Sequence, residues 1–229
     1  METNSIASRS SGRRFSVRKL AGVLFLLITL LAVFLENITP LFIVLLYLAV
    51  FILFIVGEFV ANEPEHSLII DSQGLTFIHR RGRYFIPWNN VQRIDIPTTF
   101  QFPNTKKLNY IGIKLKRPRE HYESVPLKLA SRILIEQREL QGLVAKQACS
   151  GGSCDLGDVA DQIYWTSDDG HNLDGLIAMY ASRSDNLAKY LGFQVFISSE
   201  AFLEDIDIVL KKVSMAKNES NMYLNTRQP

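Results

Sequence analysis

Two long apolar runs stand near the start of the chain, and shorter alternating patterns follow them. The first run covers residues 20–35 without a charged side chain, and the second covers residues 38–56. A helix rises about 1.5 Å per residue, so these runs would extend about 24 and 28 Å, close to the roughly 30 Å hydrocarbon core of a bilayer. The pattern predicts a transmembrane helical hairpin over residues 20–60, with spans at 20–35 and 38–58.

Three other structures compete with the hairpin. A cleaved signal peptide would share the basic start of the chain, but no small-x-small cleavage site follows Leu35. A buried hairpin of a globular domain would show a polar stripe at helical spacing, which neither run has. A re-entrant pair, which enters and leaves the bilayer on one side, also fits so tight a connection. Two full spans are the preferred prediction.

Basic residues predict which way such a hairpin would face. The first nineteen residues hold five Lys or Arg side chains, whereas residues 36–40 between the runs hold none. By the positive-inside rule, residues 1–19 form a basic cytoplasmic tail, and the second span returns the chain to the same side. The expected location is the inner (cell) membrane, as a multi-pass protein with both termini cytoplasmic.

The pattern after the hairpin changes from strands to helices. Alternating apolar residues and turn signals predict an antiparallel meander over residues 67–117, interrupted by a polar loop at 98–107. Residues 127–147 then repeat apolar positions at helical spacing. Further helices are predicted at 173–181, 186–191 and 200–215, around a late strand at 193–197.

Together these elements predict one α+β domain over residues 61–216 and a flexible tail over residues 217–229. The sequence leaves open whether residues 150–216 belong to the same fold as the meander or form a separate small unit.

The net charge of +2 hides an uneven distribution along the chain. Residues 61–130 hold eleven basic and six acidic side chains, whereas residues 131–229 hold nine and fourteen. Each Lys or Arg close to an anionic leaflet contributes about 1 kcal/mol of attraction. The candidate contacts with an anionic lipid or a partner are Arg80, Arg81, Arg83, Arg93, Lys114, Lys116, Arg117 and Arg119.

A plainer interpretation stays open for part of this set. Lys114 and Lys116 fall on the solvent-facing positions of a strand whose other face is apolar. Nucleic-acid binding is not predicted, because the basic residues are not part of a recognised nucleic-acid motif.

No pattern in the sequence predicts catalysis, a cofactor or a metal site. The four histidines are scattered and share no metal-ligand spacing. Residues 168–171, Asp-Asp-Gly-His, combine carboxylates with an imidazole, but Asp-Asp-Gly is typical of a turn. Cys149 and Cys154 flank a Gly/Ser sequence and are expected to be reduced thiols in a flexible linker, since a structural zinc site needs four ligands. The sequence therefore predicts that the protein is not an enzyme.

Residues 67–96 resemble the start of a known kind of domain. Leu-Ile-Ile-Asp-Ser-Gln-Gly-Leu at 68–75 is followed by Arg-Gly at 81–82 and Ile-Pro-Trp at 86–88. This order resembles bacterial pleckstrin-homology-like (PH-like) domains, many of which follow a pair of membrane helices. The matching positions are Asp71, Gly74, Leu75, Arg81, Gly82, Ile86, Pro87, Trp88, Val91 and Ile94.

The whole chain, including Gly-Phe-Gln-Val-Phe-Ile-Ser-Ser at 192–199, also resembles a family of bacterial inner-membrane proteins, domain of unknown function 2982. This resemblance implies a membrane-anchored PH-like α+β domain and no known reaction. A PH-like domain closes with one final helix, so the several helices after residue 127 depart from that pattern. Either the PH-like fold carries an α/β extension, or the resemblance ends with the meander.

The resulting hypothesis is a non-catalytic, membrane-tethered scaffold or adaptor that presents a cytoplasmic domain to a protein partner. Binding through a sheet edge or through the acidic helices at 173–215 is expected. The alternative is sensing of anionic lipid by the basic face, and a membrane-associated enzyme of unknown reaction is a more distant one.

Overall fold

The computed structural model describes residues 4–8, 20, 22–30, 40–61, 66–101, 104–149 and 160–226. The chain divides into two compact units. Unit 1 comprises Met1–Ala7 and His66–Pro229, and unit 2 comprises Ser8–Glu65.

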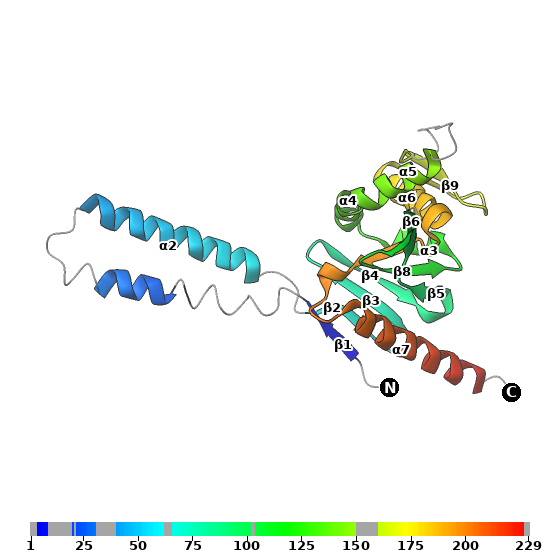
Figure 1. Ribbon diagram of the computed structural model, residues 1–229, viewed down its shortest axis with the longest axis horizontal. Coiled ribbons are helices and arrows are strands. Elements are labelled where there is room, and N and C mark those ends of the chain that lie inside the picture. The colour runs from blue at the N-terminus through cyan, green and yellow to red at the C-terminus, as the bar shows by residue number, and fades with distance from the viewer. Residues whose placement is uncertain are drawn as a thin grey trace. The chain divides into compact units, whose positions relative to one another are not determined.

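Unit 1 is a mixed α/β structure whose described strands form several small antiparallel sheets (Figure 1). The first sheet has the order β1-β2-β3-β4, the second has the order β11-β8-β5, and the pairs β6-β7 and β9-β10 form two-stranded ribbons. The antiparallel pairing predicted for residues 67–117 is therefore present, although it is divided between sheets. The strands are β1 (Asn4–Ala7), β2 (His66–Ile70), β3 (Gly74–His79), β4 (Gly82–Pro87), β5 (Val91–Asp95), β6 (Thr98–Gln101), β7 (Asn104–Lys107), β8 (Tyr110–Leu115), β9 (Tyr164–Thr166), β10 (Asn172–Asp174) and β11 (Val195–Ser198).

The motif residues between positions 71 and 88 build the turn from β2 into β3. The Asp71 carboxylate accepts hydrogen bonds from the amides of Gln73 and Gly74, at 2.7 and 2.8 Å. The indole of Trp88 is buried and donates to the Asp71 carbonyl oxygen at 2.9 Å. A Cβ at Gly74 would lie 2.3 Å from the carbonyl oxygen of Ile86, so the approach of β3 to β4 requires glycine here. The residues that carried the PH-like resemblance thus have structural roles.

A buried asparagine fixes the end of β8. Asn90 ends the short 3₁₀ helix η1 (Trp88–Asn90), and its Nδ2 donates to the Arg117 carbonyl oxygen at 3.0 Å. Its Oδ1 accepts from the Arg117 amide at 2.7 Å, and its carbonyl oxygen accepts from the Lys116 amide at 2.8 Å. These bonds position the basic residues that follow β8.

The helices of unit 1 lie on both sides of the strands. Figure 1 shows α4, α5 and α6 together on one side and α7 on the other. The single helix predicted at 127–147 is two helices that meet at Gln137, and the two predicted between 173 and 191 are one. The helices are α3 (Pro118–Ser124), α4 (Leu127–Glu136), α5 (Arg138–Ala148), α6 (Gly175–Leu191) and α7 (Ile206–Thr226), with the 3₁₀ helix η4 (Ser199–Ala201) before α7.

The late strand joins the two halves of unit 1. β11 pairs with β8, so that Val195 lies opposite Ile113 and Ile197 lies opposite Ile111. These side chains belong to one core with Val209 of α7. Residues from the second half of the chain therefore complete a sheet begun by the first half, and they do not form a separate unit.

Regular elements also occupy parts of both predicted tails. β1 lies within residues 1–19 and pairs with β2, and its Ile6 side chain is fully buried. α7 continues past residue 216, where the Ser220 hydroxyl donates to the Ser72 carbonyl oxygen at 3.2 Å.

Unit 2 contains α2 (Pro40–Ala61) and a helical stretch over residues 22–30. The rings of Phe25 and Tyr47 lie 5.6 Å apart, and Thr29 Oγ1 lies 3.2 Å from the Tyr47 hydroxyl. These contacts join α2 to the helical stretch at 22–30.

Within the described residues, no helix combines the length and the apolar character that crossing a membrane requires. The prediction of transmembrane spans at 20–35 and 38–58 is therefore wrong. So is the multi-pass inner-membrane location with cytoplasmic termini that depended on those spans.

Cys149 follows the last residue of α5 and is disulfide-bonded. The prediction that it is a reduced thiol is wrong. Cys154, with the rest of residues 150–159, lies outside the described residues.

Candidate functional site

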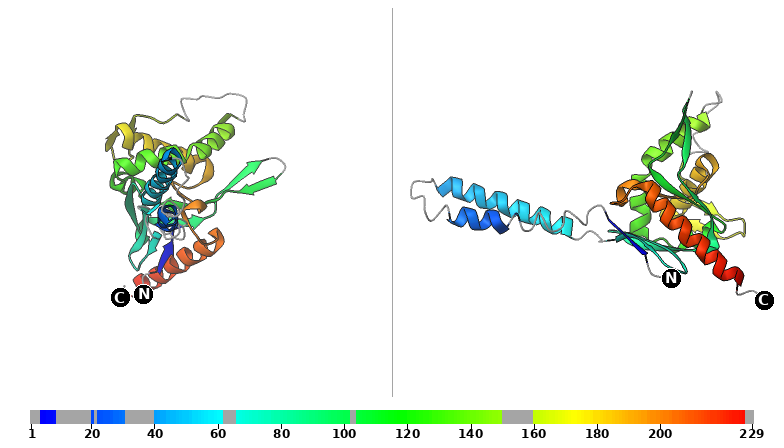
Figure 2. Two further views of the ribbon diagram at one scale, coloured as in Figure 1. Left: turned by 90° about the vertical axis from the view of Figure 1, so that its left-hand side faces the viewer. Right: turned by 60° about the horizontal axis from the view of Figure 1, so that its bottom comes forward.

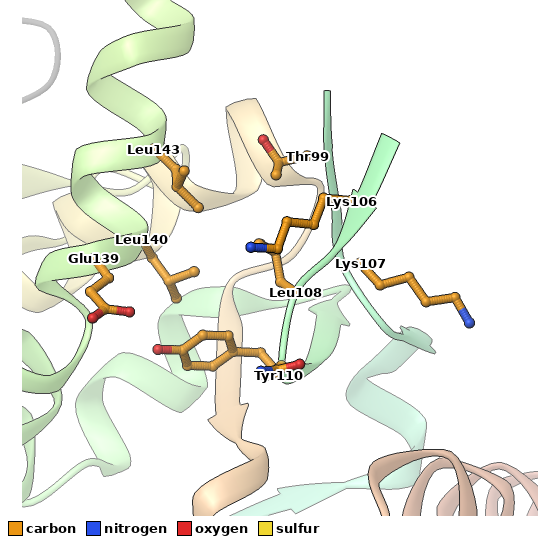
Figure 3. A pocket seen from close by; sticks show the side chains of 9 residues that line it. Thr99, Lys106, Lys107, Leu108, Tyr110, Glu139, Leu140 and Leu143 are labelled. Atoms are coloured by element: carbon orange, nitrogen blue, oxygen red, sulfur yellow. The ribbon is translucent and has the colours of Figure 1, made fainter. Parts of the chain in front are cut away.

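A groove of about 250 Å³ lies between α5 and the strands β7 and β8 (Figure 3). Leu140 and Leu143 of α5 face Leu108 across it, and these three side chains make an apolar floor. The polar residues that line the groove are Thr99, Lys106, Lys107, Asn109, Tyr110 and Glu139. The groove therefore combines an apolar floor with both basic and acidic edges.

Figure 3 shows how the polar side chains are aimed. The Lys106 side chain extends into the space in front of Leu140, whereas Lys107 points away from it. The Tyr110 hydroxyl points toward Glu139. Burial, and to a lesser degree the negative charge of Glu139, raises the pKa of Tyr110, so this hydroxyl remains a hydrogen-bond donor at neutral pH.

The groove exists because the ribbon β6-β7 extends beyond the second sheet. Figure 2 shows the ribbon projecting from the rest of unit 1. At its base, the Gln147 side chain of α5 donates to the Thr99 hydroxyl at 3.1 Å. Sequence analysis assigned residues 98–107 to a polar loop, and the weak signal that it missed is the run Thr98-Thr99-Phe100, which combines β-branched and aromatic residues.

The outer edge of β7 presents backbone groups beside this groove. The Leu108 amide donates to Pro97 on the β6 side, at 2.8 Å, whereas the Asn109 carbonyl oxygen accepts from the Ser199 amide on the other side, at 2.9 Å. Backbone groups alternate in direction along a strand, so those of Thr105 and Lys107 point away from β6. Among the described residues, β7 pairs only with β6. This edge can therefore accept another strand.

The eight basic residues predicted as contacts lie in three separate places on unit 1. Arg80, Arg81 and Arg83 are exposed at the turn from β3 to β4 and along β4, in the first sheet. Arg117 and Arg119 lie at the start of α3. Arg93, Lys114 and Lys116 belong to the second sheet or its end. The fold does not bring them together on one face.

The two arginines at the start of α3 are compensated by acids. Arg117 lies 3.1 Å from the Glu120 carboxylate. Arg119 lies 3.6 Å from Glu123 and 3.5 Å from Asp169. These ion pairs reduce the positive charge that this part of the surface offers to a ligand.

Arg93, Lys114, Lys116 and Lys217, here called the basic strip, form a cluster that contains three of the predicted residues. Arg93 and Lys114 are opposite each other on β5 and β8. Lys217 of α7 donates to the Gln92 carbonyl oxygen at 2.7 Å, and partial burial, then the nearby Lys116, lowers its pKa. In the described part of the chain, none of the four forms an ion pair with a carboxylate.

Sequence analysis missed Lys217 because it placed the residue in a frayed tail. The signal that could have found it is the buried face of α7, which continues at helical spacing from Val213 through Ala216 to Ser220.

A second group of polar side chains is buried between α3, α6 and the β9-β10 ribbon. His121 Nε2 lies 2.9 Å from the Tyr180 hydroxyl, and the His121 ring meets the Tyr84 ring edge-on at 4.8 Å. Burial lowers the pKa of His121 to about 3. The imidazole is therefore neutral at physiological pH, and its full burial favours a structural role over proton transfer to a substrate.

The predicted turn at residues 168–171 is confirmed. It joins β9 to β10, and Gly170 has a φ of 78°. The Ser167 amide donates to the His171 carbonyl oxygen at 2.9 Å. Asp168, Asp169 and His171 are exposed, which agrees with turn chemistry.

A family model described as "Protein of unknown function (DUF2982)" matches residues 68–219. No curated protein matches the chain. No solved structure matches it either, so the PH-like fold stays an interpretation of the motif.

Proposed function

Since the chain belongs to the DUF2982 family, whose function is unknown, we propose that it is a non-catalytic interaction protein that binds an extended segment of a partner protein. The segment adds as a strand to the outer edge of β7 and places side chains in the groove against α5. The observation that carries this proposal is the open backbone edge of β7 beside a groove with an apolar floor.

Strand addition supplies affinity through the backbone and specificity through side-chain pockets. On β7 the backbone of Thr105 and Lys107 faces outward, because the Leu108 amide is bonded on the β6 side and backbone groups alternate in direction along the strand. Alternate side chains of an added strand would reach Leu108 and Leu140. Lys106, which extends into the groove, favours a segment that carries an acidic residue.

Selection of a displayed random peptide library on the full chain tests this function. The expected peptides alternate apolar and acidic residues and bind in an extended form. Lys107→Pro removes the outward amide and should weaken binding of a selected peptide at least tenfold. Lys107→Ala keeps the amide and should change binding by less than about threefold, because the backbone carries the contact.

A charge test uses two lysines on neighbouring elements. Lys106→Glu should weaken binding of acidic peptides, whereas Lys146→Glu, at an exposed position of α5 outside the lining residues, should not. Selected peptides that bind equally well to the Lys107→Pro variant would contradict strand addition. Failure to select any peptide would contradict the function itself.

We propose anionic-lipid binding by the basic strip as the second candidate. The observation that favours it is the clustering of four cations without paired carboxylates in the described residues. The test is flotation of the full chain with phosphatidylcholine vesicles, with and without phosphatidylserine, at low and high salt. Salt-sensitive flotation with the anionic vesicles should be lost in Lys116→Glu/Lys217→Glu and kept in Lys146→Glu/Lys189→Glu. Equal flotation with neutral vesicles would exclude this candidate.

A further inference from the structure

The last helix of unit 1 has two apolar faces, of which the fold buries one. Val209, Val213 and Ala216 of α7 are buried in the core. On another side of the helix, Ile208, Met215 and Met222 are 51%, 53% and 67% exposed. Isolated exposed apolar residues are common, but here three large ones occur in one helix.

These three residues line up along the helix. Neighbouring members of this set are seven positions apart. Seven residues of an α-helix fall only about 20° short of two full turns. Ile208, Met215 and Met222 therefore form one stripe about 21 Å long. A stripe at this spacing is typical of a seam between two helices.

The charges beside the stripe are arranged unevenly along the helix. Lys211 and Lys212 precede Met215, and Glu219 follows it by four positions. Lys211 and Glu219 are exposed and form no ion pair within the described residues, whereas Lys212 pairs with Glu204 of the same chain at 2.7 Å. Between Ile208 and Met222, the charged side chains beside the stripe are thus basic before Met215 and acidic after it, and Asp207 adds an acid in the first turn of the helix.

The stripe and its charges are complementary to those of a second copy of α7 that runs in the opposite direction. A two-fold axis through Met215 would place Ile208 of one copy against Met222 of the other. It would also bring Lys211 and Lys212 of one copy next to Glu219 of the other, because they lie about equally far from Met215 on opposite sides. A parallel pair would instead place lysine against lysine and glutamate against glutamate. A two-fold interface uses the same patch on both copies, as this stripe allows.

We propose that two copies of this chain associate through an antiparallel contact between their α7 helices, centred on Met215. The contact is independent of the groove beside β7. A single helix pair covers less surface than a standard interface, so the dimer is expected to form reversibly, at micromolar concentrations.

Sedimentation of the full chain over a range of concentrations tests the proposal. The wild-type protein should shift from monomer to dimer as its concentration rises. Met215→Lys places two ammonium groups on the two-fold axis and should weaken the dimer at least tenfold. Ile135→Lys makes the same change at a half-exposed position of α4 and should leave association unchanged. Circular dichroism of both variants verifies that they remain folded.

A charge exchange tests the antiparallel direction. Glu219→Lys should weaken the dimer, and the double variant Lys211→Glu/Glu219→Lys should restore it, since opposite charges again meet across the axis. A protein that stays monomeric at all concentrations would overturn the proposal. Association that survives Met215→Lys unchanged would overturn it too, because the contact would then lie elsewhere. Loss of the dimer without rescue by the exchange would overturn the antiparallel direction.

Discussion

The Tyr122 hydroxyl donates a hydrogen bond of 2.6 Å to the Asp185 carboxylate and thereby ties α3 to α6. The Trp165 indole donates to the other oxygen of the same carboxylate, at 2.7 Å, which adds the β9-β10 ribbon to this junction. Burial raises the pKa of Asp185, and the two hydrogen bonds oppose that rise. One carboxylate thus joins three elements that are distant in the sequence.

Removing this carboxylate should be costly. Asp185→Ala leaves the Tyr122 hydroxyl and the Trp165 indole without their acceptor, and we expect the free energy of unfolding to fall by about 2–4 kcal/mol. Urea denaturation of the two proteins measures the difference. Asp169→Ala is the control, because that side chain is 74% exposed and should matter by less than about 0.5 kcal/mol. Similar losses of unfolding free energy in both variants would contradict the role of Asp185 in joining the three elements.

His121 should make the stability of unit 1 depend on pH. Burial lowers the pKa of His121 to about 3, whereas an unfolded histidine has a pKa of about 6.5. Between these values the unfolded chain binds more protons, so stability is fully present above about pH 6.5. It falls as pH decreases, by at most about 1.4 kcal/mol per pH unit from this residue.

His121→Gln removes this titration and keeps a polar partner for the Tyr180 hydroxyl. Denaturation from about pH 7 to about pH 4 should show the stability of the wild type approaching or crossing that of the variant as pH falls. The carboxyl groups of the chain titrate in both proteins, so their contributions to the stability difference cancel. The neighbouring phenols of Tyr84 and Tyr180 stay neutral, since burial raises their pKa values. A difference that does not change with pH would contradict the buried neutral imidazole.

Two glycines should respond in opposite directions to alanine. Gly74→Ala places a Cβ 2.3 Å from the Ile86 carbonyl oxygen, and we expect a loss of about 1–3 kcal/mol because backbone must move. Gly142 lies in α5, where an added Cβ would meet no atom within 4 Å, so Gly142→Ala should stabilise the helix by up to about 1 kcal/mol. Thermal unfolding of both variants distinguishes these effects. A tolerated Gly74→Ala would mean that β3 and β4 approach less closely.

The buried pair of Asp161 and Arg183 should behave differently from a surface pair. Arg183 Nε donates to Asp161 at 2.7 Å, and its Nη1 donates to the Leu134 carbonyl oxygen at 2.9 Å. Asp161→Ala leaves a buried guanidinium uncompensated, and we expect a loss of about 3–5 kcal/mol. Arg132→Ala, which breaks the exposed pair with Glu136, should cost at most about 1 kcal/mol. Equal losses of unfolding free energy in the two variants, measured by chemical denaturation, would contradict the difference between the buried pair and the exposed pair.

Local features of the sequence predicted several parts of this structure. The antiparallel strands that follow residue 67, the helical residues of 127–147 and the turn at 168–171 all follow from spacing and residue type within a few positions. The family was also recognisable from short motifs. These features are local because each is set by hydrogen bonds or periodicity among near neighbours.

Only the tertiary structure decided the rest. Pairing of β11 with β8 and of β1 with β2 joins segments far apart in the chain, which local periodicity does not encode. The groove depends on where α5 lies beside the ribbon β6-β7, and the basic strip depends on where α7 brings Lys217. The apolar runs at 20–56 show the same limit: hydropathy predicted two spans, but among the described residues no helix is long and apolar enough to cross a membrane. The sequence by itself determined the short-range elements, and packing between distant segments determined the candidate sites.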